Sequence, residues 1–484
     1  MERGSGRVTG QAGERLLLVG VDVGTTLTKA GVVDAGGREI VRAAVPTVWR
    51  PTATGAETSG DALLASVLDV LREVMVVAPR GSVVALGVTS MAETVVLLDA
   101  AGGTLGPAIA WHDVRATGEH EAYRRDLGTD AIGRCTGLGT SQIPTIATLR
   151  WLARNVVETR RAVRALSVAE WIAYRLGGEQ AAEASLASRT GALAVAGRAW
   201  WSDALEWASV PSTLFPPVRQ AGTPFGRIHE APPGCERLRG AVVTVAGHDH
   251  LCGSVGIGAV DSSQVTDSCG TAEALVRAVP ASPDRDLSEG LDRGLEIGWH
   301  VLADHYAVIG GLSLGLNLTA VLGRLRVVSE HGSTSLDQGA LALGSGNLSR
   351  RDAPRSPVAS LRERVDVSEI ERLGDGSPEA TWRAALESDV AGARELLDGF
   401  EALGGPVAEV RISGGWSRNP VLVALKRSCF PAPTYPRVEE AGIRGAALLA
   451  GLAAGLFASV DELPPPPVGD ASVARAAAAS GGFE

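Results

Sequence analysis

The sequence feature that most constrains the fold is a short pattern that occurs twice, once near the start of the chain and once past its middle. In residues 16–33 an apolar run ends in DVGTT at 22–26, and a second apolar run follows. In residues 263–276 the order is the same, with DSCGT at 267–271. Each copy predicts a β-hairpin whose turn can hold phosphate, because glycine permits a positive φ and exposes backbone N–H groups, while threonine adds a hydroxyl donor. Two such turns predict a nucleotide held between two related domains.

Composition agrees with two domains and excludes a polyanionic partner. The 484 residues exceed the roughly 250 to 300 at which a single core stops growing. The net charge is −10, and the chain has no basic block of the kind that binds nucleic acid. The five cysteines are odd in number, scattered and never spaced as C-x-x-C. This usage predicts free thiols in a reducing compartment, and therefore a cytoplasmic protein.

The two ends of the chain predict no globular structure and no membrane anchor. Residues 1–14 are polar and rich in glycine, which predicts a disordered extension rather than a secretory signal. Residues 445–460 are apolar, but they are dominated by alanine and glycine and are shorter than the roughly 20 residues that a bilayer requires. Residues 461–484, with a proline run and then an alanine-rich stretch, predict a flexible tail.

The hydrophobic periodicity predicts mixed sheets covered by helices. Strand-like runs at 16–21, 29–33, 83–88 and 95–98 alternate with helical stretches such as 60–77. A domain boundary is expected near Asp261, giving an N-terminal domain at 15–261 and a C-terminal domain at 262–460.

Six sequence words together resemble the FGGY family of carbohydrate kinases, within the actin, hexokinase and Hsp70 superfamily. They occur in the order typical of that family: DVGTTLTKAGVVD at 22–34, GVTSMAETVVLLDAAG at 87–102, WHDVR at 111–115, AGHDH at 246–250, DSCGTAE at 267–273 and GGWSRNP at 414–420. The resemblance covers about residues 15–460. It implies an α/β protein with two related domains of ribonuclease H-like (actin-like ATPase) type, each a mixed sheet flanked by helices, and a cleft between them. It also implies ATP and Mg²⁺ as cofactors.

The resemblance places the nucleotide at both turns and at a later glycine pair. Asp22 ends a buried strand, where a carboxylate is costly without a cation or hydrogen-bond partners, so Mg²⁺ held through water is expected there, shared with Asp249. Taken alone, each turn also fits an ordinary hairpin. The residues expected at the nucleotide are Gly24, Thr25 and Thr26 at the γ-phosphate, Gly270 and Thr271 at the β-phosphate, Gly414, Gly415 and Asn419 at the adenosine, and Gly310 and Gly315 close by.

Asp249 is the expected catalytic base. It follows the apolar strand at 241–246, and phosphoryl transfer to an alcohol needs a carboxylate that orients the hydroxyl and accepts its proton. His248 and His250 suggest a metal site, but side chains on an extended segment alternate in direction, which argues against three ligands on one ion. His250 is instead expected to hydrogen-bond the substrate; alternatively it is only a polar residue at the start of a helix.

Glu93 and Trp111 are expected to bind the acceptor. The loop at 90–94 carries a Met-His pair in xylulose kinases and an Arg-Glu pair in glycerol kinases, whereas this chain has Ala92 and Glu93. Glu93 can accept hydrogen bonds from two hydroxyls. The alternative is a loop glutamate exposed to solvent. Trp111 offers an apolar face and an indole donor. Asp113 and Arg115 are expected to organise the loop.

The expected function is ATP-dependent phosphorylation of a hydroxyl on a small sugar or polyol. Within enzymes the alternative is a polyol kinase of glycerol or erythritol type rather than a ketose kinase; outside them it is a non-catalytic sugar or nucleotide sensor on the same fold. Residues 343–377 are polar and rich in arginine where relatives carry a proline-rich loop over the cleft. The resemblance therefore does not identify the acceptor. No nucleic acid or membrane partner is expected, and a homodimer is left open.

Overall fold

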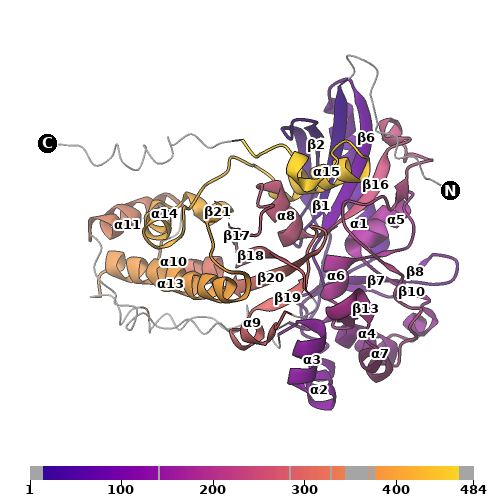
Figure 1. Ribbon diagram of the computed structural model, residues 1–484, viewed down its shortest axis with the longest axis horizontal. Helices are drawn as coiled ribbons and strands as arrows, with labels where there is room; N and C mark the ends of the chain where they lie inside the picture. Colours follow the sequence, from indigo (N-terminus) through magenta and orange to yellow (C-terminus); the bar gives the residue numbers. More distant parts are fainter. Residues whose placement is uncertain are drawn as a thin grey trace.

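The computed structural model describes residues 15–139, 142–282, 285–327, 330–343, 370 and 376–467. The extension expected at 1–14, most of the atypical segment at 343–377 and the tail beyond residue 467 lie outside the described residues. Figure 1 shows the arrangement of the elements.

The first part of the chain builds a six-stranded sheet, its covering helices and several small strand pairs. The elements are β1 (Leu16–Val23), β2 (Leu27–Asp34), β3 (Glu39–Pro46), β4 (Arg50–Pro51), β5 (Ala56–Thr58), α1 (Gly60–Val77), β6 (Ser82–Ser90), β7 (Val95–Leu98), β8 (Thr104–Leu105), β9 (Ala108–Ile109), α2 (Thr117–Leu127), α3 (Thr129–Thr136), α4 (Thr145–Asn155), β10 (Arg164–Ser167), α5 (Val168–Arg175), β11 (Ala182–Glu183), α6 (Ala184–Ser188), β12 (Leu193–Ala194), β13 (Ala199–Trp200), α7 (Ser202–Ala208), β14 (Val218–Arg219), β15 (Gly226–Arg227), β16 (Val242–His248) and α8 (Asp249–Gly256).

The second part builds a five-stranded sheet and the helices around it. The elements are β17 (Gln264–Cys269), β18 (Glu273–Pro280), α9 (Ser288–Asp292), β19 (Glu296–Trp299), β20 (His305–Leu312), α10 (Leu314–Arg324), α11 (Glu330–Ala342), α13 (Pro378–Gly404), β21 (Glu409–Ser413), α14 (Pro420–Cys429) and α15 (Ala441–Ala453).

The two sheets repeat one topology, as the duplicated sequence pattern predicts. The first sheet has the strand order β15-β16-β6-β1-β2-β3, and the second has β19-β20-β18-β17-β21. In the first, β1 is antiparallel to β2 and parallel to β6, while β2 is antiparallel to β3. In the second, β17 is antiparallel to β18 and parallel to β21, while β18 is antiparallel to β20. The expected pair of related α/β domains is therefore confirmed.

Helices fill the space between the sheets and cover their outer faces. Alternate β1 residues point to opposite faces, so Leu17 packs with α1 and α5, whereas Leu18 packs with α15. On the second sheet, one face packs against α13 and α14, and the opposite face contacts α8 and α15. Figure 1 shows α8 and α15 between the two sheets.

Local sequence explains where the main helices begin. Ser59 caps α1 by accepting a hydrogen bond from the backbone N–H of Ala62. Ser167 and Glu170 form a reciprocal capping box at the start of α5. Helix α15 begins without a side-chain cap and depends on packing instead, because its small residues let backbones approach closely. A Cβ atom at Gly20 would lie 1.9 Å from the carbonyl oxygen of Ile443, so only glycine fits there.

Space and sequence divide the chain differently. The boundary expected near Asp261 falls in the loop between α8 and β17, and it stays a prediction. Helix α15 belongs to the segment 262–460 but packs on the first sheet.

Hydrogen bonds fix the described part of the tail to α15. Arg444 donates to the carbonyl oxygens of Pro464 and Pro465 at 2.6 and 3.1 Å. Residues 464 and 465 are therefore anchored to α15, and the flexibility expected from residue 461 stays a prediction. Within the described ranges every helix is too short or too polar to cross a lipid bilayer.

Candidate active site

A cavity of about 160 Å³ lies where the two sheets face each other, and both contribute to its wall. The first part of the chain supplies Thr25, Met91, Ala92, Glu93, Trp111, Gln142, Arg189, His248, Asp249 and His250. The second part supplies Ala272, Glu273, Ala274, Gly294, Glu296, Ile309 and Gly311. The structure therefore brings together all four residues expected to contact the acceptor: Glu93, Trp111, Asp249 and His250.

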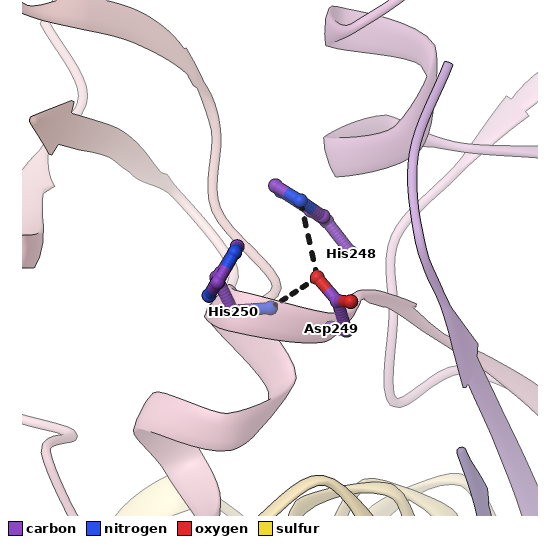
Figure 2. Close-up of side chains that lie close together, drawn as sticks. All are labelled: His248, Asp249 and His250. Atoms are coloured by element: carbon purple, nitrogen blue, oxygen red, sulfur yellow. Dashed lines mark hydrogen bonds and ion pairs between the residues drawn. The ribbon is translucent and has the colours of Figure 1, made fainter. Parts of the chain in front are cut away.

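Asp249 stands at the junction of β16 and α8 with one carboxylate oxygen already engaged (Figure 2). Its Oδ1 accepts a hydrogen bond from the backbone N–H of His250 at 2.7 Å, and Nε2 of His248 lies 3.2 Å from the same oxygen. Burial holds the pKa of His248 well below its ordinary value, which favours the neutral ring. Neither contact involves Oδ2, which is therefore the oxygen suited to accept a proton.

The sequence argument against convergence of His248, Asp249 and His250 is wrong. One ligand atom from each side chain lies within 4.8 Å of the others. The strand ends at His248 and the helix begins at Asp249, so the strict alternation of a strand does not continue through these residues. The three side chains are therefore close enough to share an ion, which the sequence argument had judged unfavourable.

A buried chain of hydrogen bonds fixes the backbone just before Asp249. The N–H of His248 donates to Ser185 Oγ at 3.0 Å, and that hydroxyl donates to Glu183 Oε2 at 2.5 Å. The same Glu183 oxygen accepts the N–H groups of Ser185 and Leu186. Burial raises the pKa of Glu183 to about 7. This support was not expected from the sequence, because residues 183 and 185 carry no recognisable motif.

Asp22 has the surroundings of a cation ligand. It is buried, and its Oδ1 has no hydrogen-bond partner among the described residues. Burial raises its pKa to about 7, even though Lys29 Nζ lies 3.7 Å from Oδ2 and favours the charged form. A divalent cation would satisfy the unpaired oxygen, so the residues present fit Mg²⁺. Lys29 was missed at the sequence level although it lies in the first motif; it also donates to Glu440 at 2.7 Å.

The two expected phosphate turns connect paired strands, but their glycines do not have positive φ. Among the described residues, the glycines at positive φ include Gly247 and Gly414 but neither Gly24 nor Gly270. A Cβ atom on Gly24 would lie 3.2 Å from the carbonyl oxygen of Leu27, and one on Gly270 would lie 3.3 Å from that of Ala272. A side chain at either turn would therefore crowd the carbonyl oxygen beside it. Thr26 is exposed at the first turn and Thr271 after the second, whereas Thr25 is half-buried.

A buried lysine fixes the second hairpin. Lys426 of α14 donates to Asp267 on β17 and Glu273 on β18, and its Nζ lies 3.1 Å from Cys269 Sγ. Burial alone would lower the pKa of Lys426, but the two carboxylates outweigh it and hold that pKa well above its ordinary value. The ion cluster ties both strands of the turn to one helix. The sequence gives no signal for it, because α14 is distant in the chain from the hairpin.

The glycine pair expected at the adenosine follows β21, as predicted. The nearby Asn419 side chain already makes hydrogen bonds within the protein. Gly414 has φ 93° and packs on the backbone of Cys269, whereas the space above Gly415 is open. Asn419 was expected to line the base. Instead its Oδ1 caps α14 by accepting from the N–H groups of Val421 and Leu422, at 3.0 and 2.9 Å. Its Nδ2 donates to Asp337 at 2.8 Å. The amide of Asn419 therefore stabilises the start of α14, and its contact with the base stays a prediction.

Of the two further glycines, one lies against a phosphate turn and the other does not. A Cβ atom on Gly315 would lie 2.4 Å from the carbonyl oxygen of Gly270, so this glycine packs directly on the second turn. A Cβ atom on Gly310 would instead lie 2.7 Å from Leu396 of α13. Packing explains Gly310, whose nucleotide contact stays a prediction, and its neighbour Gly311 lines the cavity.

Trp111 uses its indole N–H within the protein. Its Nε1 donates to Thr25 Oγ1 at 2.8 Å, which couples the expected acceptor wall to the first phosphate turn. The face of the Trp111 ring therefore remains available to the cavity. Behind it, Arg115 makes a two-pronged contact with Asp113 at 3.0 and 2.8 Å and reaches Glu57 at 2.6 Å. The pKa of Asp113 falls to about 2, because these hydrogen bonds outweigh the effect of burial. Asp113 and Arg115 thus organise the loop, as expected.

Glu93 is a buried ion-pair partner rather than a solvated loop residue. Arg189 Nε donates to its Oε1 at 2.7 Å, and Arg189 Nη1 donates to Glu296 Oε2 at 2.5 Å. Glu93 is held at φ 60°, a conformation that non-glycine residues rarely adopt and that is often kept at functional sites. Arg189 and Glu296 were missed, because they come from distant segments and carry no motif that the sequence argument used.

Comparisons with known proteins agree with this geometry. Residues 17–256 match the N-terminal domain of the FGGY family of carbohydrate kinases, and residues 345–454 match its C-terminal domain. The chain is 26% identical to a glycerol kinase of Aromatoleum aromaticum and 28% identical to one of Rhodospirillum rubrum, each over 92% of both chains. Among solved structures, it is similar to a xylulose kinase from Rhodospirillum rubrum, with a TM-score of 0.80, 21% identity and 96% of each chain covered. A gluconate kinase from Lactobacillus acidophilus has a TM-score of 0.79, 18% identity and the same coverage. The structural likenesses establish the fold.

Proposed function

Because the chain belongs to the FGGY family of carbohydrate kinases, we propose that it transfers the γ-phosphoryl group of ATP to a hydroxyl of a small sugar or polyol held beside Asp249. The observation that carries this assignment is the half-engaged carboxylate. The His250 N–H donates to Asp249 Oδ1 at the wall of the cavity, with His248 Nε2 3.2 Å from the same oxygen, and this leaves Oδ2 to take the hydroxyl proton. A coupled assay of ADP release, run over pentoses, hexoses, tetritols and glycerol, tests the proposal; failure of every acceptor would contradict it.

In this mechanism the protein's contribution is positioning and desolvation. The acceptor lies between Trp111 and Asp249, and Asp249 Oδ2 accepts its proton as the oxygen attacks phosphorus in line. Thr25, at the first turn, accepts the Trp111 N–H and so links acceptor and phosphate sites. Bound Mg²⁺, held by Asp22 with Asp249 nearby, would neutralise phosphate charge. Closure of the two domains excludes water.

At the second turn, we expect Gly270→Val to weaken ATP binding. The β-carbon would already lie 3.3 Å from the carbonyl oxygen of Ala272, and the two branch methyls would fill the space that we assign to phosphate. Loss of hydrogen bonds to a charged phosphate costs about 1.5 to 3 kcal/mol, or roughly 10- to 150-fold in KM for ATP. Steady-state kinetics at saturating acceptor measure this. Equal losses for ATP and acceptor would point to misfolding instead.

For the acceptor side, Glu93→Ala is expected to raise KM for the acceptor by roughly 10- to 150-fold while sparing KM for ATP, because a charged hydrogen-bond partner is removed. Both Michaelis constants are measured on the purified variant. Glu179→Ala provides the control, since Glu179 is an exposed residue paired with Arg219 and should change kinetics less than about twofold. An unchanged acceptor KM in Glu93→Ala would remove Glu93 from the pocket.

One observation favours a polyol acceptor of the glycerol or erythritol type as the second candidate. This chain has Ala92 where glycerol kinases carry an arginine. Arg189, from another segment, supplies a guanidinium instead, with its Nε 2.7 Å from Glu93 Oε1. An arginine–glutamate pair therefore faces the cavity, built from a segment different from the one that the sequence suggested. In the acceptor panel, a preference for glycerol or tetritols over ketoses would support this candidate.

A further inference from the structure

The ion cluster at the far wall of the cavity contains more negative than positive charge. Arg189 is shared between Glu93 on the first part of the chain and Glu296, the first residue of β19 on the second sheet. The exposed fractions of the three side chains are 9% for Glu93, 8% for Arg189 and 15% for Glu296. One guanidinium cannot neutralise two carboxylates, so the cluster retains a net negative charge in a poorly solvated place.

One oxygen of this cluster has no hydrogen-bond donor. Glu296 Oε2 accepts from Arg189, but its Oε1 is shielded from solvent and has no hydrogen-bond partner in the described part of the chain. Because a buried acceptor without a donor is costly and Glu296 lines the cavity, rotation of its carboxylate toward a donor in the cavity would relieve this cost. A hydroxyl group is such a donor, whereas a carboxylate is not.

The other charges around the cavity point in the same direction. Asp249 adds a third carboxylate, while Glu273 is already paired with Lys426 behind the wall. Arg189, which both glutamates already hold, is the one lysine or arginine among the described lining residues. An acceptor with its own carboxylate would therefore meet like charges without a free cation to receive it.

We propose that Glu296 is an acceptor-recognition residue supplied by the second sheet, and that it selects an uncharged polyol or sugar over the corresponding sugar acid. The inference rests on the proposed kinase function and adds a specificity to it. Asp249 comes from the first part of the chain and Glu296 from the second, so both parts contribute to acceptor recognition.

The test compares acceptors that have the same carbon skeleton and differ in charge, xylitol with xylonate and glucitol with gluconate, on the full-length protein. Calorimetric binding is measured beside ADP release, so that selection is scored even without turnover. We expect wild-type affinity or kcat/KM to favour the neutral member by about tenfold or more. Glu296→Gln should weaken the neutral acceptor and reduce its advantage over the acid at least about threefold.

Two further variants separate charge from structure. Glu296→Asp keeps the charge but shortens the side chain, so it should weaken the neutral acceptor while still excluding the acid. Glu289→Gln changes an exposed glutamate of α9 that pairs with Arg293, and it should behave as wild type. Equal binding of acid and neutral acceptor by the wild type, or an equal change for both in Glu296→Gln, overturns the inference alone. If the neutral acceptor binds but no ADP is released, the kinase function is contradicted, while the binding data still test the selectivity. If neither the neutral acceptor nor the acid binds, both the kinase function and the selectivity are overturned.

Discussion

Replacing Asp249 by asparagine is expected to lower kcat by roughly 10² to 10⁴, the range for the loss of a general base, and to leave ATP binding nearly intact. Asparagine keeps an oxygen that can accept from the His250 N–H, so this local hydrogen bond survives. What is lost is Oδ2, which becomes an amide nitrogen that cannot accept a proton. The substitution therefore isolates the chemical step.

The measurement pairs single-turnover kinetics with ATP titration by calorimetry. Asp69→Asn is the matched control, because Asp69 is a largely exposed residue of α1 whose charge pairs with Arg72. It should alter kcat less than about twofold, within the range of surface substitutions. Turnover of Asp249→Asn near the wild-type value would mean that another group accepts the proton. Loss of ATP affinity together with kcat would instead indicate that the asparagine disturbs the cleft.

Features encoded in contiguous sequence could be predicted, because local rules govern them. The hairpins around Gly24 and Gly270 follow from apolar runs broken by turn residues, and Asp249 was placed at the end of a buried strand for the same reason. The cavity does gather Glu93, Trp111, Asp249 and His250, which lie in separate sequence words. That convergence followed from the family resemblance, since periodicity alone does not bring distant strand ends together.

Features that depend on tertiary packing could not be predicted. Arg189 contacts Glu93, which is 96 positions away, and Glu296, which is 107 positions away. Pairing over such separations leaves no periodic signal in the sequence. Asn419 shows another limit: its position at a strand-to-helix turn suits both a ligand contact and an N-cap, and the cap uses its side-chain oxygen, so its place at the adenosine stays a prediction. The glycines at 24 and 270 do not have the positive φ that the sequence argument assumed, and their contact with phosphate also stays a prediction.

The largest effect on stability is expected from Lys426→Met. Lys426 is 1% exposed, and its ammonium is bonded to Asp267 and Glu273, whose side chains are completely buried. Methionine has a similar unbranched length but no charge, so both carboxylates lose their cation in a site that water does not reach. Removing one partner of a buried ion pair typically costs about 3 to 5 kcal/mol of unfolding free energy. Since a small domain has only about 5 to 15 kcal/mol in total, the second sheet should unfold at markedly lower urea concentration.

Three comparisons make the Lys426 prediction specific to charge. Arg427→Met, one residue further on the exposed side of α14, should change stability by about 0.5 kcal/mol or less. Adding Asp267→Asn and Glu273→Gln to Lys426→Met should recover more than half of the loss, because neutral amides do not repel each other. The defect should also depend on pH. Burial already raises the pKa of Glu273 well above its ordinary value, and without the ammonium the folded-state pKa rises further. A carboxyl group with a raised folded pKa stabilises the folded state when protonated and loses that contribution as pH rises, so the defect should be smaller at pH 5 than at pH 8. A loss that is equal at both pH values would mean that the lysine matters for packing and not for its charge.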